Sequence, residues 1–153
     1  MIPQDDVAEG VVLVVRRTIP VPRERVFAAW LDPVGMTRWM CAGKVTRATV
    51  ELDPRVGGSF VIVMTHEDRA HEHRGQYLAI EPPSLLSFTW ISESTEHRPT
   101  VVTVEFHERA AGAATEVVLT HRDLPPSQLD GHRGGWGDIL RKLADVLTDA
   151  GAG

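Results

Sequence analysis

Apolar and polar residues alternate along the middle of the chain, from Val45 to His121, and turn residues interrupt the alternation at regular intervals. A period of two is typical of β-strands with one buried face. The spacing predicts six strands joined by hairpin-length connections, and a Val-rich segment at 11–19 predicts one more before them. The six strands are expected at 45–52, 58–66, 71–80, 85–91, 100–108 and 114–121. Together these segments predict a mainly antiparallel sheet of about seven strands.

Three of these strands show which of their faces is buried, because apolar side chains recur at every second position. The positions are Leu86, Phe88 and Trp90; Val102, Val104 and Phe106; Val117, Leu119 and His121. In the hairpin 58–66/71–80 we expect a register that pairs Phe60 with Tyr77, Ile62 with Gly75, Met64 with His73, and His66 with His71. The opposite face of this hairpin is also apolar, which indicates a homodimer contact or packing under another element. Its residues are Val61, Val63, Leu78 and Ile80.

Helical patterns precede and follow these strands. Pro22 suits the first turn of a helix over 23–31, and Asp32-Pro33 repeats the start signal for a second short helix. From Ser127 onward, apolar residues repeat at the three-and-four spacing of a long amphipathic helix: Trp136, Ile139, Leu140, Leu143, Val146 and Leu147. Four glycines weaken its first half, each by up to about 1 kcal/mol relative to alanine. We expect that half, with Gly131, Gly134, Gly135 and Gly137, to be mobile or bent where a ligand enters.

Composition indicates one compact domain. The chain has 153 residues, of which 42% are hydrophobic and 24% charged, enough for one core and too few for two. Sixteen Lys and Arg against 21 Asp and Glu give a net charge of −5, so nucleic acid is not an expected partner. Cys41 is the only cysteine, and no apolar run is long enough for a signal core or a membrane span, so we expect a cytoplasmic protein without a membrane partner. Residues 1–9 and 151–153 are expected to be frayed tails.

Four segments, in their order and spacing, resemble a known superfamily. They are PRERVFAAWLDPVGMTRW at 22–39, GGSF at 57–60, the segment from Gly75 to Trp90, and Gly135-Trp136 in the last helix. Along nearly its whole length the chain resembles the START-like (SRPBCC) superfamily and, within it, the domain named after the activator of the Hsp90 ATPase. The resemblance implies an α+β helix-grip fold, in which a curved sheet wraps around the C-terminal helix and two short helices follow the first strand. It also implies one domain over 1–153 and a cavity between the sheet and the last helix.

An aromatic set is the candidate lining of that cavity. Sites for apolar molecules are mostly aromatic walls with a few polar groups, although the same residues fill the core of any small domain. The predicted ligand-binding residues are Trp39, Met40, Phe60, Tyr77, Phe88, Trp90, His121 and Trp136. Within the aromatic set, Trp30 and Trp136 are expected to belong more to the core, and Trp39, Met40, Tyr77 and Trp90 more to the cavity wall. No catalytic residue, cofactor or metal is assigned.

Several histidines are candidates for functional sites other than the aromatic cavity wall. His66, His71 and His73 stand in a charged hairpin, where His66 and His71 would lie close enough to share a zinc ion. A solvated hairpin tip explains the same three residues without a metal. His121 and His132 would either meet a ligand and carry protons, or be hydrogen-bonded structural residues.

Three functions are compatible with these observations. The first is a non-enzymatic carrier or sensor that holds a small hydrophobic or aromatic molecule between the sheet and the last helix. The second is an enzyme similar to START-like cyclases and aromatases, in which Tyr77, His121 or Arg38 carries a proton or polarises a substrate; a polar cavity residue with a strongly perturbed pKa would favour it. The third, implied by the family name, is a chaperone-interaction module in the stress response, which requires a charge-complementary patch.

Overall fold

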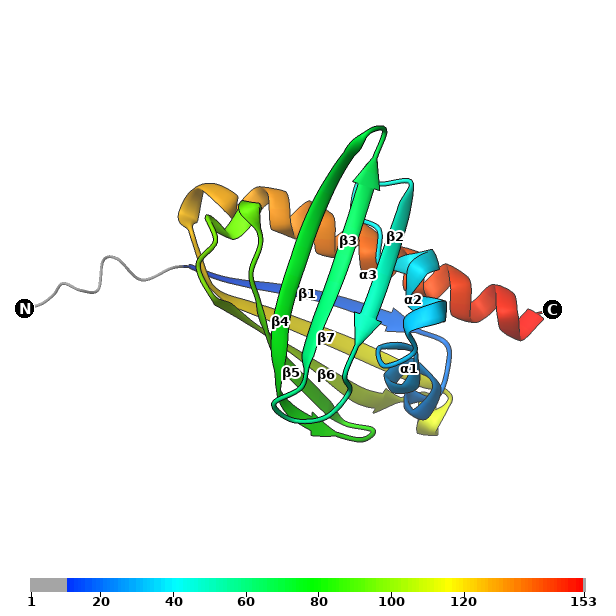
Figure 1. Cartoon of the computed structure of the whole chain (residues 1–153). Coiled ribbons are helices and arrows are strands. Elements are labelled where there is room, and N and C mark those ends of the chain that lie inside the picture. Colours follow the sequence, from blue (N-terminus) through cyan, green and yellow to red (C-terminus); the bar gives the residue numbers. More distant parts are fainter. Residues whose placement is uncertain (1–10, 153) are drawn as a thin grey trace, which may run out of the picture.

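The computed structural model describes residues 11–152, with side chains to residue 149 (Figure 1). The strands are β1 (Val11–Ile19), β2 (Arg47–Leu52), β3 (Ser59–His66), β4 (Arg69–Glu81), β5 (Leu85–Trp90), β6 (Thr100–Arg109) and β7 (Ala114–Leu124). Helices α1 (Arg23–Ala29) and α2 (Pro33–Trp39) follow β1, and α3 (Leu129–Ala152) follows β7. Short 3-10 turns are η2 (Glu93–Thr95), η3 (Ala110–Gly112) and η4 (Pro126–Gln128). The predicted elements are all present, with ends displaced by a few residues.

The seven strands form one sheet in the order β1-β7-β6-β5-β4-β3-β2, and every neighbouring pair is antiparallel. A register shift between Tyr77 and Ala79 marks a bulge in β4, and a bulge bends a strand and increases its twist. Figure 1 shows the sheet curving around α3, with α1 and α2 together at one end. The predicted α+β helix-grip fold is confirmed.

The concave face of the sheet and the inner side of α3 share one core. On β5, β6 and β7 the positions predicted to face inward are buried. The apolar stripe of α3 meets them through Trp136, Ile139, Leu140 and Leu143, each at most 2% exposed. Burying one such side chain contributes roughly 1.5–3 kcal/mol. The sheet therefore holds α3 mainly through this stripe.

The β3–β4 hairpin has a different register from the predicted one. Glu67 and Asp68 form a two-residue turn, in which Glu67 adopts the left-handed φ of 57° that tight hairpin turns favour. The observed pairs are Phe60 with Gly75, Ile62 with His73, Met64 with His71, and His66 with Arg69. The predicted pairing, which corresponds to a four-residue connection, is wrong by two residues. Because the shift is even, the inward-facing residues are those predicted, but His66 and His71 are not opposite each other.

The outer face of the same hairpin stays partly exposed. Leu78 is 48% exposed, and Val61 and Val63 are half-buried. Ile80 was predicted on this face, but beyond the bulge in β4 it pairs with the buried Leu86 and packs against the core, so that placement is wrong. Apolar side chains that face solvent in a group mark interaction surfaces more often than scattered ones do. A homodimer contact at this face stays a prediction.

Two hydrogen bonds tie the connection between α2 and β2 to α3. Lys142 Nζ donates to the carbonyl oxygen of Cys41 at 2.6 Å, and the backbone N–H of Gly43 donates to Asp138 Oδ2 at 3.1 Å. Gly43 has a φ of 57°, a backbone conformation that glycine adopts without strain. These bonds hold Ala42 beside α3 and close one end of the space between helix and sheet.

The ends of the chain bear on two further predictions. The tail predicted at residues 1–9 lies outside the described residues, whereas α3 continues through Ala152, into the second predicted tail. None of the described helices is long and apolar enough to cross a membrane.

Candidate ligand-binding site

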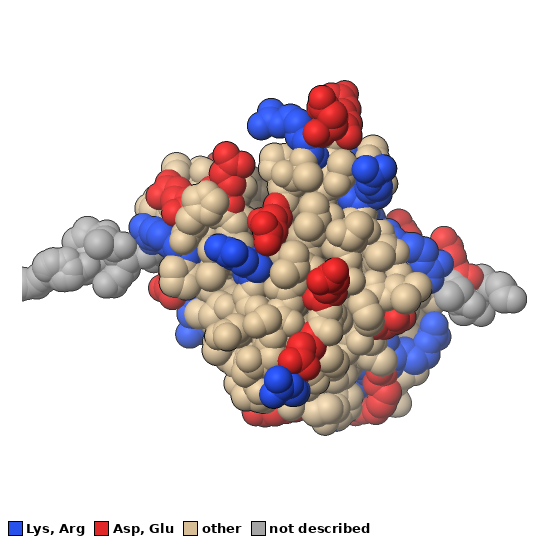
Figure 2. Space-filling model, viewed as in Figure 1, with Lys and Arg blue, Asp and Glu red and all other residues tan. Residues whose placement is uncertain are grey.

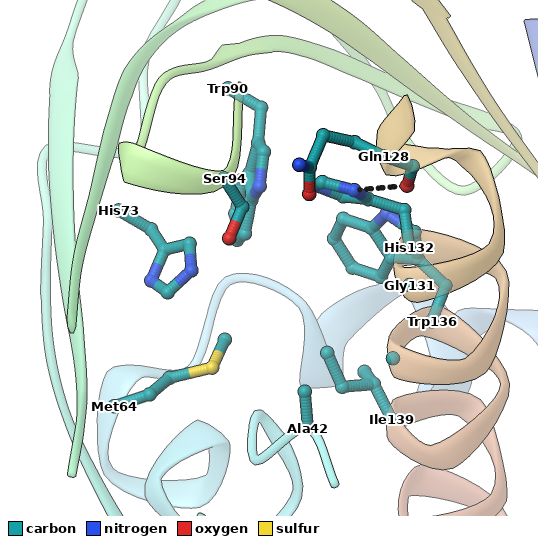
Figure 3. Close-up of a pocket in the computed structure, with 11 residues that line it drawn as sticks. Ala42, Met64, His73, Trp90, Ser94, Gln128, Gly131, His132, Trp136 and Ile139 are labelled. Atoms are coloured by element: carbon teal, nitrogen blue, oxygen red, sulfur yellow. Dashed lines mark hydrogen bonds between the residues drawn. The ribbon is translucent and has the colours of Figure 1, made fainter. Parts of the chain in front are cut away.

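A cavity of about 180 Å³ lies between the sheet and the first half of α3. The lining residues are Ala42, Met64, His73, Trp90, Ser94, Gln128, Gly131, His132, Gly135, Trp136 and Ile139. They come from the α2–β2 connection, from β3, β4 and β5, from η2, and from η4 and α3. Ser94 and Gly131 are exposed and mark the mouth. Figure 3 shows His73 and Met64 on one side, with His132, Trp136 and Ile139 on the other.

Trp90 and Trp136 are the two predicted ligand-binding residues that line this cavity. Their rings pack against each other with centroids 5.0 Å apart. Phe60, Tyr77 and Phe88 lie deeper, where their rings pack together at centroid distances of 5.4 to 6.3 Å. The free space among them is about 10 Å³, which holds one water molecule at most. The central part of the predicted site is therefore filled by its own side chains.

The two predicted site residues around the end of α2 also lie in this filled region. Trp39 packs edge-on against Trp30, with ring centroids 5.0 Å apart, and Met40 borders the 10 Å³ space. All three side chains are at most 2% exposed. The end of α2 therefore fills the centre of the core with side chains. The cavity lies beyond it, next to the start of α3.

His121 lies behind the cavity wall and positions both tryptophans. Its ring is completely buried, and Trp136 Nε1 donates a hydrogen bond of 3.0 Å to its Nδ1. Because Nδ1 accepts, the neutral ring carries its proton on Nε2, which donates to Thr100 Oγ1 at 2.7 Å. Thr100 in turn donates to the backbone carbonyl of Trp90. Burial, with a smaller contribution from the charge of His132, lowers the pKa of His121 to about 3.

Two other histidines face the cavity itself. Burial lowers the pKa of His73 to about 4, and burial also lowers the pKa of His132. Both rings are therefore neutral at pH 7. His73 stacks against Trp90 with ring centroids 5.0 Å apart, and its buried Nδ1 has no hydrogen-bond partner among the described residues. Burial first, and the charge of Asp53 second, raise the pKa of Tyr77 to about 12, so its hydroxyl group stays protonated at neutral pH.

Several lining residues were not predicted from the sequence, among them Met64, Ser94, Gln128 and Ile139. They belong to different elements, and only the fold brings them together. The glycine-rich start of the last helix was the available signal. Two of its four glycines, at 131 and 135, line the cavity.

The three hairpin histidines do not gather around a common point. His73 lies in the cavity, while His71 Nδ1 is 3.9 Å from Glu93 Oε1 and His66 is half-buried at the end of β3. In the part of the chain that the structure describes, no group of three or more His, Cys, Asp or Glu side chains is placed to hold a metal ion. The zinc alternative depended on His66 and His71 being cross-strand partners, and the observed register separates them.

Formal charge is absent from the cavity wall, since none of its lining residues is Asp, Glu, Lys or Arg. On the face that Figure 2 shows, acidic and basic side chains are scattered, and neither sign forms a continuous patch. A charged ligand inside the cavity would lack a counter-ion there, and burying an unpaired charge is costly. The site therefore suits a neutral molecule.

The sequence profile of the family described as Activator of Hsp90 ATPase homolog 1-like protein matches residues 20–148. The chain belongs to this family, as the resemblance predicted, and the fold and family are those of ligand-binding or Hsp90-regulating domains. No match was found among curated proteins.

Solved structures share the fold at low sequence identity. A Staphylococcus aureus protein of unknown function has a TM-score of 0.80 and 20% identity, covering 95% of this chain and 98% of that one. A Nitrosomonas europaea protein has a TM-score of 0.77 and 21% identity, with 97% and 99% covered. An Hsp90 activator from Plasmodium falciparum has a TM-score of 0.72 and 23% identity, with 91% and 97% covered. These similarities show the helix-grip fold.

Proposed function

We propose that the protein binds a small hydrophobic or aromatic molecule in the cavity between the sheet and α3, as a carrier or sensor. The observation that carries this proposal is the unfilled space beside Trp90 and Trp136, in a core that is closely packed elsewhere. A space of about 180 Å³ with two indole rings, Met64 and Ile139 in its wall is the kind of site that apolar ligands occupy.

The volume of the cavity limits the size of the ligand. An engineered cavity of about 150 Å³ binds benzene, whereas drug-sized ligands occupy pockets of about 300–1,000 Å³. A cavity of about 180 Å³ therefore suits one aromatic ring with small substituents. The parts of a larger molecule that do not fit would extend through the mouth at Ser94 and Gly131.

The test fills the cavity from the helix side. The Gly135→Leu variant places a side chain at the cavity wall, where the first added carbon would lie 3.5 Å from the Cβ of Ala42, an ordinary contact. Gly134→Leu is the matched control, because Gly134 is exposed and an added Cβ meets no heavy atom within 4 Å. Both variants gain a similar amount of helix propensity, up to about 1 kcal/mol.

Toluene, p-xylene and p-cresol are titrated against each protein, with tryptophan fluorescence and the melting temperature as readouts. At least one of them should quench the wild type and Gly134→Leu with saturation and raise their melting temperatures, because a ligand that binds only the folded state stabilises it. Gly135→Leu should respond to none. The proposal fails if no ligand acts on the wild type, or if Gly135→Leu binds as well as Gly134→Leu.

One observation favours the enzyme as a second candidate. His73 lines the cavity as a neutral imidazole with a strongly perturbed pKa, and polar cavity residues of this kind are typical of active sites. An enzyme of this type would catalyse proton exchange at carbon in a bound ketone. Acetophenone in D2O should then exchange its methyl protons faster with the wild type than with His73→Phe, measured by NMR. Equal rates in the two proteins would exclude this role for His73.

A further inference from the structure

The His132 ring offers the cavity a hydrogen-bond acceptor. Its Nδ1 lies 2.9 Å from the backbone carbonyl oxygen of Gln128 (Figure 3). A carbonyl oxygen only accepts hydrogen bonds, so Nδ1 must carry the ring proton. A neutral imidazole has one such proton, and its other nitrogen, Nε2, is therefore a bare lone pair. Within residues 11–149 no group donates to Nε2, whereas both nitrogens of His121 are occupied.

The remainder of the wall determines what else a ligand must have. The indole rings of Trp90 and Trp136 and the side chains of Met64 and Ile139 are buried and apolar, so they favour a flat hydrocarbon surface. The absence of formal charge from the lining residues disfavours carboxylates and amines. A ligand that satisfies His132 must bring a neutral donor, and the cavity volume restricts it to one ring.

We propose, resting on the function proposed above, that the cavity selects neutral phenols, whose ring lies against Trp90 and Trp136 and whose hydroxyl group donates a hydrogen bond to Nε2 of His132. A phenol keeps its proton up to about pH 10, as tyrosine does, so it is a neutral donor under ordinary conditions. Its hydroxyl is attached directly to the flat ring, which suits a cavity with an apolar wall and one acceptor. Hydrocarbons of the same shape leave His132 without a partner.

Two ligands of nearly equal shape isolate this hydrogen bond. p-Cresol carries a hydroxyl group where p-xylene carries a methyl group, and benzoate tests a charged aromatic. Dissociation constants are measured by calorimetry and tryptophan fluorescence for the wild type and for His132→Phe, which keeps a flat ring and removes the acceptor. The matched control is His107→Phe, because His107 is exposed on β6 and bonded to Glu105. The two ligands differ in the free energy of leaving water, and this difference is the same for every protein tested. The quantity compared between the wild type and the variants is therefore the ratio of the p-cresol affinity to the p-xylene affinity.

The affinity ratio should fall about tenfold in His132→Phe and stay at the wild-type value in His107→Phe. A second measurement avoids any folding defect of the variant: in wild-type protein labelled with 15N-histidine, p-cresol should shift the Nε2 resonance of His132 and p-xylene should not. An unchanged ratio in a folded His132→Phe, or tighter binding of benzoate than of p-cresol, would overturn the phenol selectivity while leaving the cavity function intact. If none of the three aromatics binds the wild type, the proposed function fails together with this inference.

Discussion

Acid should destabilise the protein through His121, and the amount follows from its burial. The folded ring has a pKa lowered from 6.5 to about 3, mainly because it is buried and to a smaller extent because of the charge of His132 beside it. In the unfolded chain the same ring takes up a proton below about pH 6.5. Between these two values the unfolded chain binds more protons than the folded one, so stability is fully present above pH 6.5 and is lost as the pH falls towards 3.

The size of the effect at pH 5 is set by the unfolded ring, since the folded ring is still neutral there. The pKa of the unfolded ring, about 6.5, lies about 1.5 units above pH 5. At 1.36 kcal/mol per unit, this difference lowers the unfolding free energy by about 2 kcal/mol. The full shift to about 3 corresponds to about 5 kcal/mol below pH 3, as an order of magnitude. His73 and His132 act in the same direction, so the comparison must be made between proteins that differ only at position 121.

The measurement is urea unfolding, followed by tryptophan fluorescence, at pH 7.5 and at pH 5. His121→Gln keeps an oxygen that can accept from Trp136 and removes the titrating ring. Between the two pH values, the wild type should lose about 2 kcal/mol more unfolding free energy than His121→Gln. His107→Gln, an exposed control on β6, should behave as the wild type. Equal losses in the wild type and His121→Gln would refute a buried, neutral His121.

Three further substitutions test the packing. Gly75→Ala should lower the unfolding free energy by more than about 3 kcal/mol, because the added Cβ would lie 1.9 Å from the carbonyl oxygen of Thr89; a thermal melt close to that of the wild type would contradict this contact. Gly134→Ala should raise the unfolding free energy by about 0.5–1 kcal/mol, since the added methyl group meets nothing within 4 Å. Urea unfolding measures this change, and a lower unfolding free energy would contradict the prediction. Lys142→Met should lower it by about 1 kcal/mol and accelerate hydrogen exchange at the amide of Gly43, because the bond to the Cys41 carbonyl is lost; unaltered exchange would show that this bond does not hold the connection.

The sheet and the helices could be predicted because burial imposes a period on the sequence. In β5, Leu86, Phe88 and Trp90 must share one face once that face is covered, and the alternation is visible without coordinates. The hairpin register was not predictable to the residue. Turns of two or four residues keep the same residues inward, and the choice depended on Glu67 adopting a positive φ.

The cavity could be expected from the resemblance, but its place could not. Whether Phe60, Tyr77 and Phe88 leave room depends on how their rings pack, which no pattern of apolar positions specifies. The roles of His121 and His132 also needed coordinates. Both lie near the junction of β7 and α3, and only the positions of their hydrogen-bond partners show that one ring is fully occupied and the other has a free acceptor.

The glycines of α3 connect the fold to the proposed site. A glycine inside a helix costs up to about 1 kcal/mol relative to alanine, and a sequence selected for stability alone would avoid four of them in seven positions. Gly135 has room for a Cβ at an ordinary contact distance from Ala42, so close packing does not require glycine there. It does border the cavity, where any side chain would take up ligand volume. Helix stability is given up at that position without a gain in packing, as expected where a binding site is kept open.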